Sequence, residues 1–326
     1  MTTLRAFITS GVVSTAAVSA LLPGPVLSQP YPSKLVRIVV GVPPGGSLNL
    51  VARLAGQKLS NGLGKPVIID NRPGAGGNIG TELAAKAPPD GYTLMVASSF
   101  FAINPSLYRK VSYDPIKDFE PVALLTTYML FLVAHPSLPA QSVKALIALA
   151  RARPGEINYA STGTGTTTHV AGELLSSMAN ARMTHIPYKG TNPQLPAVLG
   201  GEVALAFGTT AIVPLVQARK LNLLGVTGAK RSGLFPDVPT IAEAGVPGYE
   251  VTSWNALFAP AGTPASIVRR LNEEVRKGFA QADALDVFEK QGLEQAVGTP
   301  EELGALVRTE VTKWAKVIKD AEIPQQ

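Results

Sequence analysis

Two loops rich in glycine and hydroxyl residues carry the residue types that bind an anion. The first contains the Pro-Gly-Gly turn that follows a β-branched run from Leu35 to Val42, and the second extends from Ser161 to Thr168. In each, a strand pattern precedes the loop and a helix pattern follows it, so backbone N–H groups point outward at a helix N-terminus. Such a terminus carries roughly +0.5 of a unit charge and leaves N–H donors unpaired. One loop of this kind is common, but two could hold one small anion from opposite sides.

Hydroxyl side chains are concentrated at the same strand ends and helix starts. They are Ser47, Ser98, Ser99, Ser161, Thr162, Thr164, Thr166 and Thr167. Helix capping accounts for some of them, and hydrogen bonds to carboxylate oxygens are the functional alternative. The two roles are compatible, because a capping residue stands where an anion would bind. The phenol of Tyr188 and the cation of Lys189 follow a later strand, where a solvated turn is equally expected.

Three histidines, His135, His169 and His185, raise the question of catalysis. His169 follows the second loop, so a serine or threonine hydroxyl could lie within its reach. The sequence contains neither a GxSxG nucleophile motif nor an HExxH metal motif. We therefore expect no catalytic residue and no metal site, and we interpret His169 as a ligand donor. An exported hydrolase that uses a Ser/Thr–His169 pair is the main alternative.

The segment Gly74–Gly80 superficially resembles a dinucleotide-binding loop. Pro73 precedes it, its glycine spacing is not GxGxxG, and the sequence has no GK[ST] motif. We therefore expect no cofactor. A turn that lines the same cleft is the better interpretation, with Asn78 offering its amide to a ligand.

The composition limits the classes of function. The chain has 326 residues, no cysteine and a net charge of +6 that is spread along the sequence. Disulfides and thiol chemistry are excluded, and without a basic block nucleic acid is not an expected partner. Residues 1–28 contain an early Arg5, a short apolar stretch and a small-residue exit, which is typical of a secretory signal peptide. We therefore expect an exported protein that lies outside the cytoplasm.

Strand and helix patterns alternate along most of the chain, which predicts an α/β fold with parallel sheet. Helix starts are marked by Ser142, by Thr263 before a proline, and by Thr299, which forms a capping box with Glu302. The stretch from residue 104 to 122 shows no regular pattern.

We expect two passages to divide the chain into a pair of lobes. The passages lie near residues 113–122 and 253–258, which places residues 29–123 plus 257–326 in lobe 1 and residues 124–256 in lobe 2. Two lobes joined by two strands leave a cleft that can close on a ligand by hinge motion. The pattern alone also allows one large doubly wound domain.

A series of motifs extends from about Tyr31 to Ile323. It includes PPGGSLN, NRPGAGGNIG, YDPIKDFEPV, YASTGTGTTTHVAGELL, HIPYKG, PDVPTIAEAGVPGYEVTSW and FAPAGTP. With these motifs in this order, the chain resembles the Bug-type periplasmic solute receptors of tripartite tricarboxylate transporters. The resemblance implies a type II periplasmic-binding-protein fold with two lobes, a ligand cleft and a hinge. It also implies that the Pro44–Asn49 and Ser161–Thr168 loops hold a carboxylate, partly through ordered water.

The resemblance also implies the partners, namely a small organic acid and the permease subunits of a membrane transporter. We expect a monomer that binds no nucleic acid. A ligand-sensing subunit of a signalling system is a further alternative. The candidate ligand-binding residues are Pro44, Gly45, Gly46, Ser47, Asn49, Asn78, Ser98, Ser99, Ser161, Gly163, Thr164, Gly165, Thr166, Thr167, His169 and Tyr188.

Three residues depart from the family pattern. Asn49 stands where the family usually has aspartate, Ala197 stands where an acidic residue is frequent, and Ala256 replaces a frequent glycine. The two missing acids would make the cleft less favourable for an ammonium group. We therefore expect the ligand to be a carboxylate without an amine.

Overall fold

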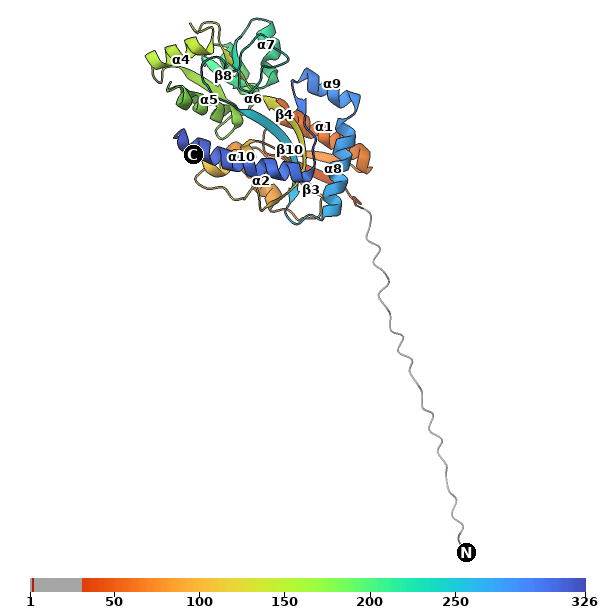
Figure 1. Ribbon diagram of the computed structural model, residues 1–326. Helices are drawn as coiled ribbons and strands as arrows, with labels where there is room; N and C mark the ends of the chain where they lie inside the picture. The colour runs from red at the N-terminus through yellow and green to blue at the C-terminus, as the bar shows by residue number, and fades with distance from the viewer. Residues whose placement is uncertain (1, 3–30) are drawn as a thin grey trace. The chain divides into compact units, whose positions relative to one another are not determined.

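The computed structural model describes residue 2 and residues 31–326, and its helices and strands all lie in one compact unit, Pro32–Gln326. The predicted signal peptide, residues 1–28, falls outside this description apart from residue 2. Two β-sheets organise the unit (Figure 1). Within the described part of the chain, no helix is both long and apolar enough to cross a membrane.

The first sheet combines parallel and antiparallel strands. In spatial order its strands are β11 (Glu294–Gln295), β4 (Phe119–Met129), β10 (Thr252–Pro260), β3 (Thr93–Ser98), β1 (Val36–Val40) and β2 (Val67–Asn71). β1 runs parallel to β2 and β3, whereas β10 is antiparallel to β3 and β4. Every residue of β3 is buried, as expected of an apolar central strand in such a sheet.

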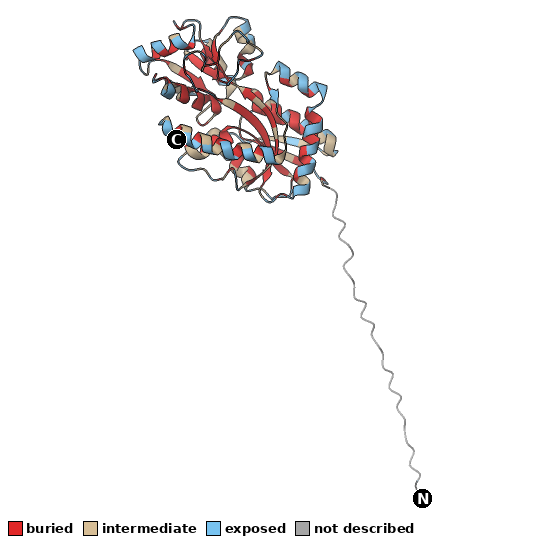
Figure 2. Ribbon diagram, viewed as in Figure 1, coloured by how far each residue is buried: buried red, intermediate tan, exposed pale blue. Residues whose placement is uncertain are grey.

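Helices from both ends of the chain pack on this first sheet. They are α1 (Gly46–Leu63), α2 (Asn78–Ala85), α3 (Phe100–Leu107), α8 (Ala265–Phe279), α9 (Ala282–Lys290) and α10 (Pro300–Asp320), with the 3₁₀ turn η1 (Ala75–Gly77) before α2. α1 packs against α8, and α10 packs against α3 and β4. The inner strands β1, β3, β4 and β10 are largely buried, and the outer faces of the helices are exposed (Figure 2).

The second sheet is built from the middle of the chain. In spatial order its strands are β7 (Thr184–Pro187), β6 (Asn158–Ser161), β8 (Leu205–Gly208), β5 (Phe131–Ala134) and β9 (Asn222–Val226). β6 runs parallel to β7 and β8, and β5 is antiparallel to β8 and β9. The accompanying helices are α4 (Val143–Ala152), α5 (Thr167–Met178), α6 (Thr191–Leu199) and α7 (Val213–Gln217), with the 3₁₀ turn η2 (Thr210–Ile212) before α7.

The chain passes between the sheets at two adjacent places. β4 leads into β5 through Leu130, and the segment after β9 returns to β10 through Val251. Thr227 joins these passages, because its N–H donates to the Leu130 carbonyl (3.0 Å) and its carbonyl accepts from the Val251 N–H (2.8 Å). Its hydroxyl also accepts from the Leu130 N–H (2.8 Å) and donates to the Val251 carbonyl (2.6 Å).

The expected lobe boundaries near residues 123/124 and 256/257 fall inside β4 and β10. Both strands belong to the first sheet over their whole length. The boundaries stay a prediction, whereas the α/β fold class agrees with the observed sheets.

The helix caps predicted from the sequence were confirmed at two positions and wrong at a third. Ser142 caps α4 by accepting from the Ala145 N–H, and Thr299 forms the predicted capping box at the start of α10. The predicted cap at Thr263 is wrong, because its hydroxyl donates to the Pro260 carbonyl and Pro264 is the N-cap of α8. The stretch without pattern is also more regular than expected, since α3 extends to Leu107 and β4 begins at Phe119.

Candidate functional site

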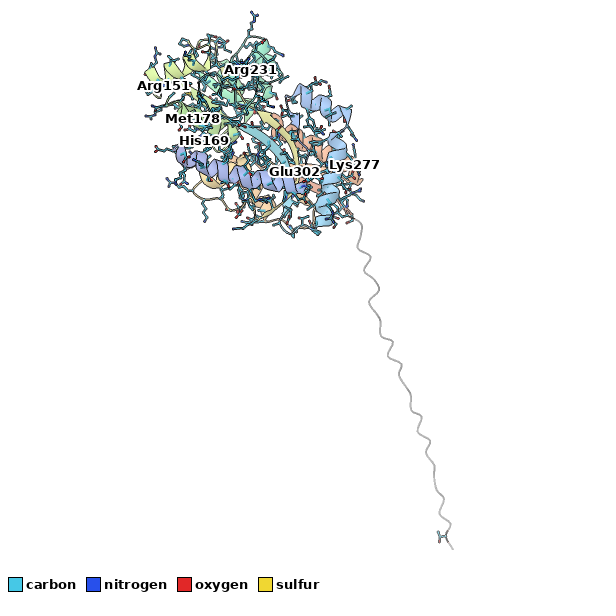
Figure 3. All side chains as sticks on the ribbon, in the orientation of Figure 1. Arg151, His169, Met178, Arg231, Lys277 and Glu302 are labelled. Carbon is cyan, nitrogen blue, oxygen red and sulfur yellow. The ribbon has the colours of Figure 1, made fainter. Side chains whose placement is uncertain are left out.

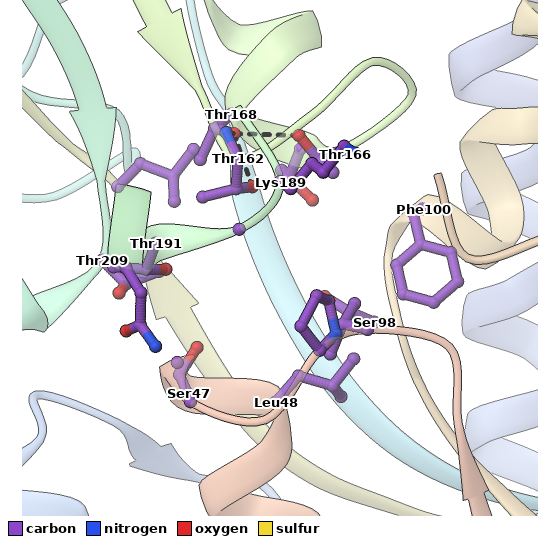
Figure 4. Close-up of a pocket in the computed structure, with 18 of the residues that line it drawn as sticks. Ser47, Leu48, Ser98, Phe100, Thr162, Thr166, Thr168, Lys189, Thr191 and Thr209 are labelled. Atoms are coloured by element: carbon purple, nitrogen blue, oxygen red, sulfur yellow. Dashed lines mark hydrogen bonds between the residues drawn. The ribbon is translucent and has the colours of Figure 1, made fainter. Parts of the chain in front are cut away.

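A cavity lies where both sheets end in strand-to-helix turns (Figure 4). Its volume is about 120 Å³, and the empty space amounts to about 750 Å³ when the part open to solvent is counted. Ligands of α/β proteins characteristically bind at the carboxyl ends of parallel strands. The lining residues are Val42, Pro43, Pro44, Gly45, Gly46, Ser47, Leu48, Ser98, Phe100, Tyr128, Leu130, Thr162, Thr166, Thr167, Thr168, Lys189, Gly190, Thr191, Asn192 and Thr209.

The first predicted loop forms one wall of the cavity. Gly45 (φ 95°, ψ 166°) and Gly46 (φ 75°) adopt backbone conformations that favour glycine and turn the chain from β1 into α1. Gly45 is the N-cap of α1, and no side chain bonds to this helix end. The first-turn N–H groups near Gly46 and Ser47 therefore have no intrahelical acceptor and suit an anion.

The second predicted loop lies on the opposite wall, where Thr162, Thr166 and Thr168 face the Ser47 side (Figure 4). Several of its backbone donors are already used inside the loop. The Thr162 N–H donates to Thr168 Oγ1 (2.9 Å), and the Gly163 N–H donates to Ser161 Oγ (3.1 Å). The first turn of α5, which begins at Thr167, supplies the donors that helix geometry leaves unpaired.

A third loop of the same construction completes the cavity. Gly190 (φ 97°, ψ −176°) is the N-cap of α6, again without a side-chain cap. Its neighbours Lys189, Thr191 and Asn192 line the cavity. From the sequence, the phenol of Tyr188 and the cation of Lys189 were noted at this place, with a solvated turn as the equal alternative, and only Tyr188 was among the candidate ligand-binding residues. The Gly-Thr start of a helix after a short strand was the available signal.

A network of buried hydroxyls connects the two sheets beside the cavity. Ser98 Oγ lies 3.0 Å from the Tyr128 hydroxyl and 3.1 Å from Ser253 Oγ. Ser99 Oγ lies 2.7 Å from Ser253 Oγ and 2.8 Å from Thr167 Oγ1. The Ser99–Thr167 pair joins the start of α3 to the start of α5, so these hydroxyls hold the two walls together. Ser253 and Tyr128 were missed, because neither belongs to a loop motif.

A histidine pair lies behind the second loop. The rings of His169, on α5 (Figure 3), and His185, on β7, are stacked with centroids 4.1 Å apart. His169 Nδ1 accepts from the Gly165 N–H at 3.3 Å, and His185 Nε2 lies 2.6 Å from Ser161 Oγ. Burial, with a smaller effect of His185, lowers the pKa of His169 to about 3. Burial lowers the pKa of His185 to about 4, so both rings are neutral at pH 7.

Among the described residues that line the cavity, Lys189 is the single charged one, and none is an aspartate or a glutamate. Among the described residues, no three histidine, cysteine, aspartate or glutamate side chains group as a metal site. The lining therefore offers N–H donors, hydroxyls and one cation, which is a donor set for an anion.

The predicted residues divide into three groups in space. Pro44, Gly45, Gly46, Ser47, Ser98, Thr166 and Thr167 line the cavity. Gly163, Thr164 and Tyr188 line an adjoining outer chamber, which shares Val42, Pro43, Thr162, Thr166, Lys189 and Gly190 with the first. Asn49, Asn78, Ser99, Ser161, Gly165 and His169 lie outside both linings. Direct ligand contact by these residues stays a prediction.

The side chains outside the linings have partners of their own. Asn49 donates to Asn71 Oδ1 (3.2 Å) and accepts from Arg53 (3.1 Å). Asn78 Oδ1 accepts from the Asn104 amide at 2.8 Å. Ala197, another residue that departs from the family pattern, is buried in the core beside the second sheet. Neither Asn49 nor Ala197 faces the cavity, so the absence of acids there rests on the observed lining.

A family model described as "Tripartite tricarboxylate transporter family receptor" matches residues 51–323. The chain belongs to this receptor family. The receptor is 36% identical over 311 residues to Protein BugT of Bordetella pertussis, an alignment that covers 94% of each chain. The predicted family is therefore confirmed.

Solved structures give the same result for the fold. A R. palustris protein solved with adipate has a TM-score of 0.86 and 38% identity, covering 91% of the receptor and 100% of that chain. MatC from Rhodopseudomonas palustris, solved with bound malate, has a TM-score of 0.83 and 33% identity, covering 88% of the receptor and 100% of that chain. The predicted two-lobed periplasmic-binding-protein fold is thereby confirmed.

Proposed function

We propose that the receptor captures a small organic carboxylate that carries no amine and delivers it to the permease subunits of a membrane transporter. The protein acts as a monomer in the periplasm after removal of residues 1–28, and it makes or breaks no bond. The observation that carries this proposal is the cavity wall, where the starts of α1, α5 and α6 meet beside Lys189 without any acidic side chain.

The donor set supports a carboxylate. Backbone N–H groups at helix N-termini stabilise negative charge, and charge-assisted hydrogen bonds to a carboxylate are stronger than neutral ones. A buried ammonium group would meet no carboxylate in this lining, and an unpaired buried charge is strongly unfavourable. Adipate and malate, the acids in the two solved relatives, carry carboxylates and no amine.

The histidine geometry argues against hydrolysis. Ser161 is fully buried, and its Oγ already bonds to the Gly163 N–H and lies beside His185. His169 Nδ1 is occupied by a backbone N–H, so it is not positioned to activate a hydroxyl in the cavity. The alternative of an exported Ser/Thr–His169 hydrolase therefore lacks a nucleophile–base pair that faces the ligand.

Calorimetric titration of the mature protein with adipate, malate, succinate and aspartate tests the proposal. We expect at least one dicarboxylate to bind, and aspartate to bind at least tenfold more weakly than succinate. A ligand at 100 times its Kd adds about 2.7 kcal/mol to the free energy of unfolding, so thermal unfolding provides an independent check. Tighter binding of aspartate than of succinate would contradict the proposal that the ligand carries no amine.

Two further measurements separate the alternatives. Turnover of a p-nitrophenyl ester that disappears in His169→Ala would favour the hydrolase. Loss of acid uptake in cells that lack the receptor supports delivery, whereas unchanged uptake with altered gene expression would favour the signalling subunit.

A further inference from the structure

The second loop has an unusual internal support. Its glycines, Gly163 (φ 135°) and Gly165 (φ 82°), could direct their N–H groups toward the cavity, yet both donate to side chains behind the loop. The acceptor for Gly165 is His169 Nδ1, and the acceptor for Gly163 is Ser161 Oγ. Ser161 Oγ in turn lies 2.6 Å from His185 Nε2, so each glycine is tied to one imidazole.

The two imidazoles are themselves held in place. His185 stacks between His169 and Tyr159, with ring centroids 4.1 and 5.1 Å away. The Tyr159 hydroxyl donates to Glu173 Oε1 at 2.6 Å, and this oxygen lies 3.9 Å from His169 Nε2. His169 has 2% of its surface exposed, so the ring has little freedom to turn.

We propose that His169 and His185 are positioning residues, which fix the second loop so that the first turn of α5 faces the anion. They act through Gly165 and through Ser161–Gly163, and they do not touch the ligand. The identity of the ligand in this inference rests on the proposed function, whereas the conformation of the loop does not. It also replaces the expectation that His169 donates directly to the ligand.

Each hydrogen bond involves a particular ring atom. At His169 this atom is the δ nitrogen, which accepts from the Gly165 N–H and which the amide oxygen of asparagine can imitate. At His185 it is the ε nitrogen, which bonds to Ser161 Oγ as donor or acceptor according to its tautomer, and the side-chain amide of glutamine can imitate either role. A role limited to filling space would not distinguish asparagine from glutamine in opposite senses at the two positions.

The swapped substitutions therefore test the proposal. We expect His169→Asn and His185→Gln to recover most of the wild-type affinity for adipate or malate. We expect His169→Gln and His185→Asn to weaken binding at least tenfold. His135→Gln and His135→Asn are the matched controls, because His135 lies in a turn where Nδ1 bonds to Ser137, away from both cavity linings. Equal losses for asparagine and glutamine at each position would overturn the proposal.

Amide hydrogen exchange of the ligand-free protein provides a readout that needs no ligand. We expect the Gly165 N–H to exchange at least tenfold faster in His169→Gln than in wild type and to remain protected in His169→Asn. Unchanged exchange in His169→Gln would overturn the positioning role. If no carboxylate binds to wild type while exchange responds as expected, the proposed function fails and the positioning role stands.

The ring pair also predicts the effect of pH. Because burial lowers both pKa values, to about 3 and about 4, the stability that the neutral rings contribute is fully present above the unfolded value near 6.5. It is lost progressively as the pH falls from that value through the folded values. Glu173, whose pKa burial raises, titrates in the opposite sense, and Tyr159 stays neutral in this range. The double variant His169→Asn/His185→Gln should therefore show a smaller decrease in Tm between pH 7 and pH 4 than the wild-type protein. A decrease equal to or larger than that of wild type would overturn the contribution of the neutral rings to stability.

Discussion

At the scale of single residues, the electrostatics of the cavity depend on Lys189. Among the described residues that line the two chambers, it is the one that carries a charge, and none of the described residues forms an ion pair with it. Opposite charge attracts an anionic ligand and strengthens its hydrogen bonds. The side chain is exposed, so solvent screens part of this effect.

We predict that Lys189→Met weakens the binding of adipate or malate about tenfold, because one charge-assisted contact is worth roughly 1.5 kcal/mol. The free energy of unfolding should stay within about 0.5 kcal/mol of wild type, since the residue is exposed. Lys144→Met, at an exposed position on α4, is the matched control. Calorimetric titration at two salt concentrations measures the effect, and equal affinities of Lys189→Met and wild type would contradict it.

The residue types of the site were predictable, but their individual roles were not. Ser98, Thr166 and Thr167 were candidates because hydroxyls gather at helix starts, and they do line the cavity. Ser161 was chosen by the same rule, yet its hydroxyl bonds behind the loop. Which way a hydroxyl points depends on its tertiary neighbours, here the two histidines, and sequence spacing does not contain that information.

At the scale of elements, the cavity is built by repeating one unit, in which a strand, a glycine and an uncapped helix follow each other. The clearest repetition joins α1 and α6, whose N-caps Gly45 and Gly190 have nearly the same backbone conformation. The unit was predicted at α1 and α5, where several glycines signal it. The unit at α6 was overlooked because a single glycine after a short strand is also typical of an ordinary turn.

We predict that Gly45→Ala and Gly190→Ala each lower the free energy of unfolding by about 1–3 kcal/mol, because this φ/ψ region is almost restricted to glycine. A Cβ on Gly45 would also lie 3.2 Å from the Asn192 amide across the cavity. Ligand affinity should fall in both variants, since the helix starts move. Gly233→Ala is the control, because no atom lies within 4 Å of its Cβ position. Urea unfolding and titration check both effects, and stabilities equal to that of the control would contradict the strain.

At the scale of the whole molecule, the alternation of strand and helix patterns was enough to predict the fold class. The connection between the sheets was harder to predict. β4 runs through the expected lobe boundary, because its apolar sequence suits a buried strand on both sides of that point. The return segment from Thr227 to Val251 contains no strand of its own, so its pattern gives no signal. What unites the two passages is a set of hydrogen bonds at Thr227, and sequence reasoning had no means of finding them.

Thr227 is fully buried, and its side chain serves one backbone group from each passage. Thr227→Val keeps the shape of the side chain but leaves the Leu130 N–H and the Val251 carbonyl without this partner. An unsatisfied buried group costs about 1–3 kcal/mol, so we predict a loss of roughly 2–4 kcal/mol in the free energy of unfolding. Thr227→Ser keeps the hydroxyl and should lose less than half as much. Urea unfolding measures both values. The same hydroxyl fixes the two passages to each other, so adipate or malate should also bind more weakly to Thr227→Val than to Thr227→Ser. Equal stability of the two variants would show that the hydroxyl does not join the passages.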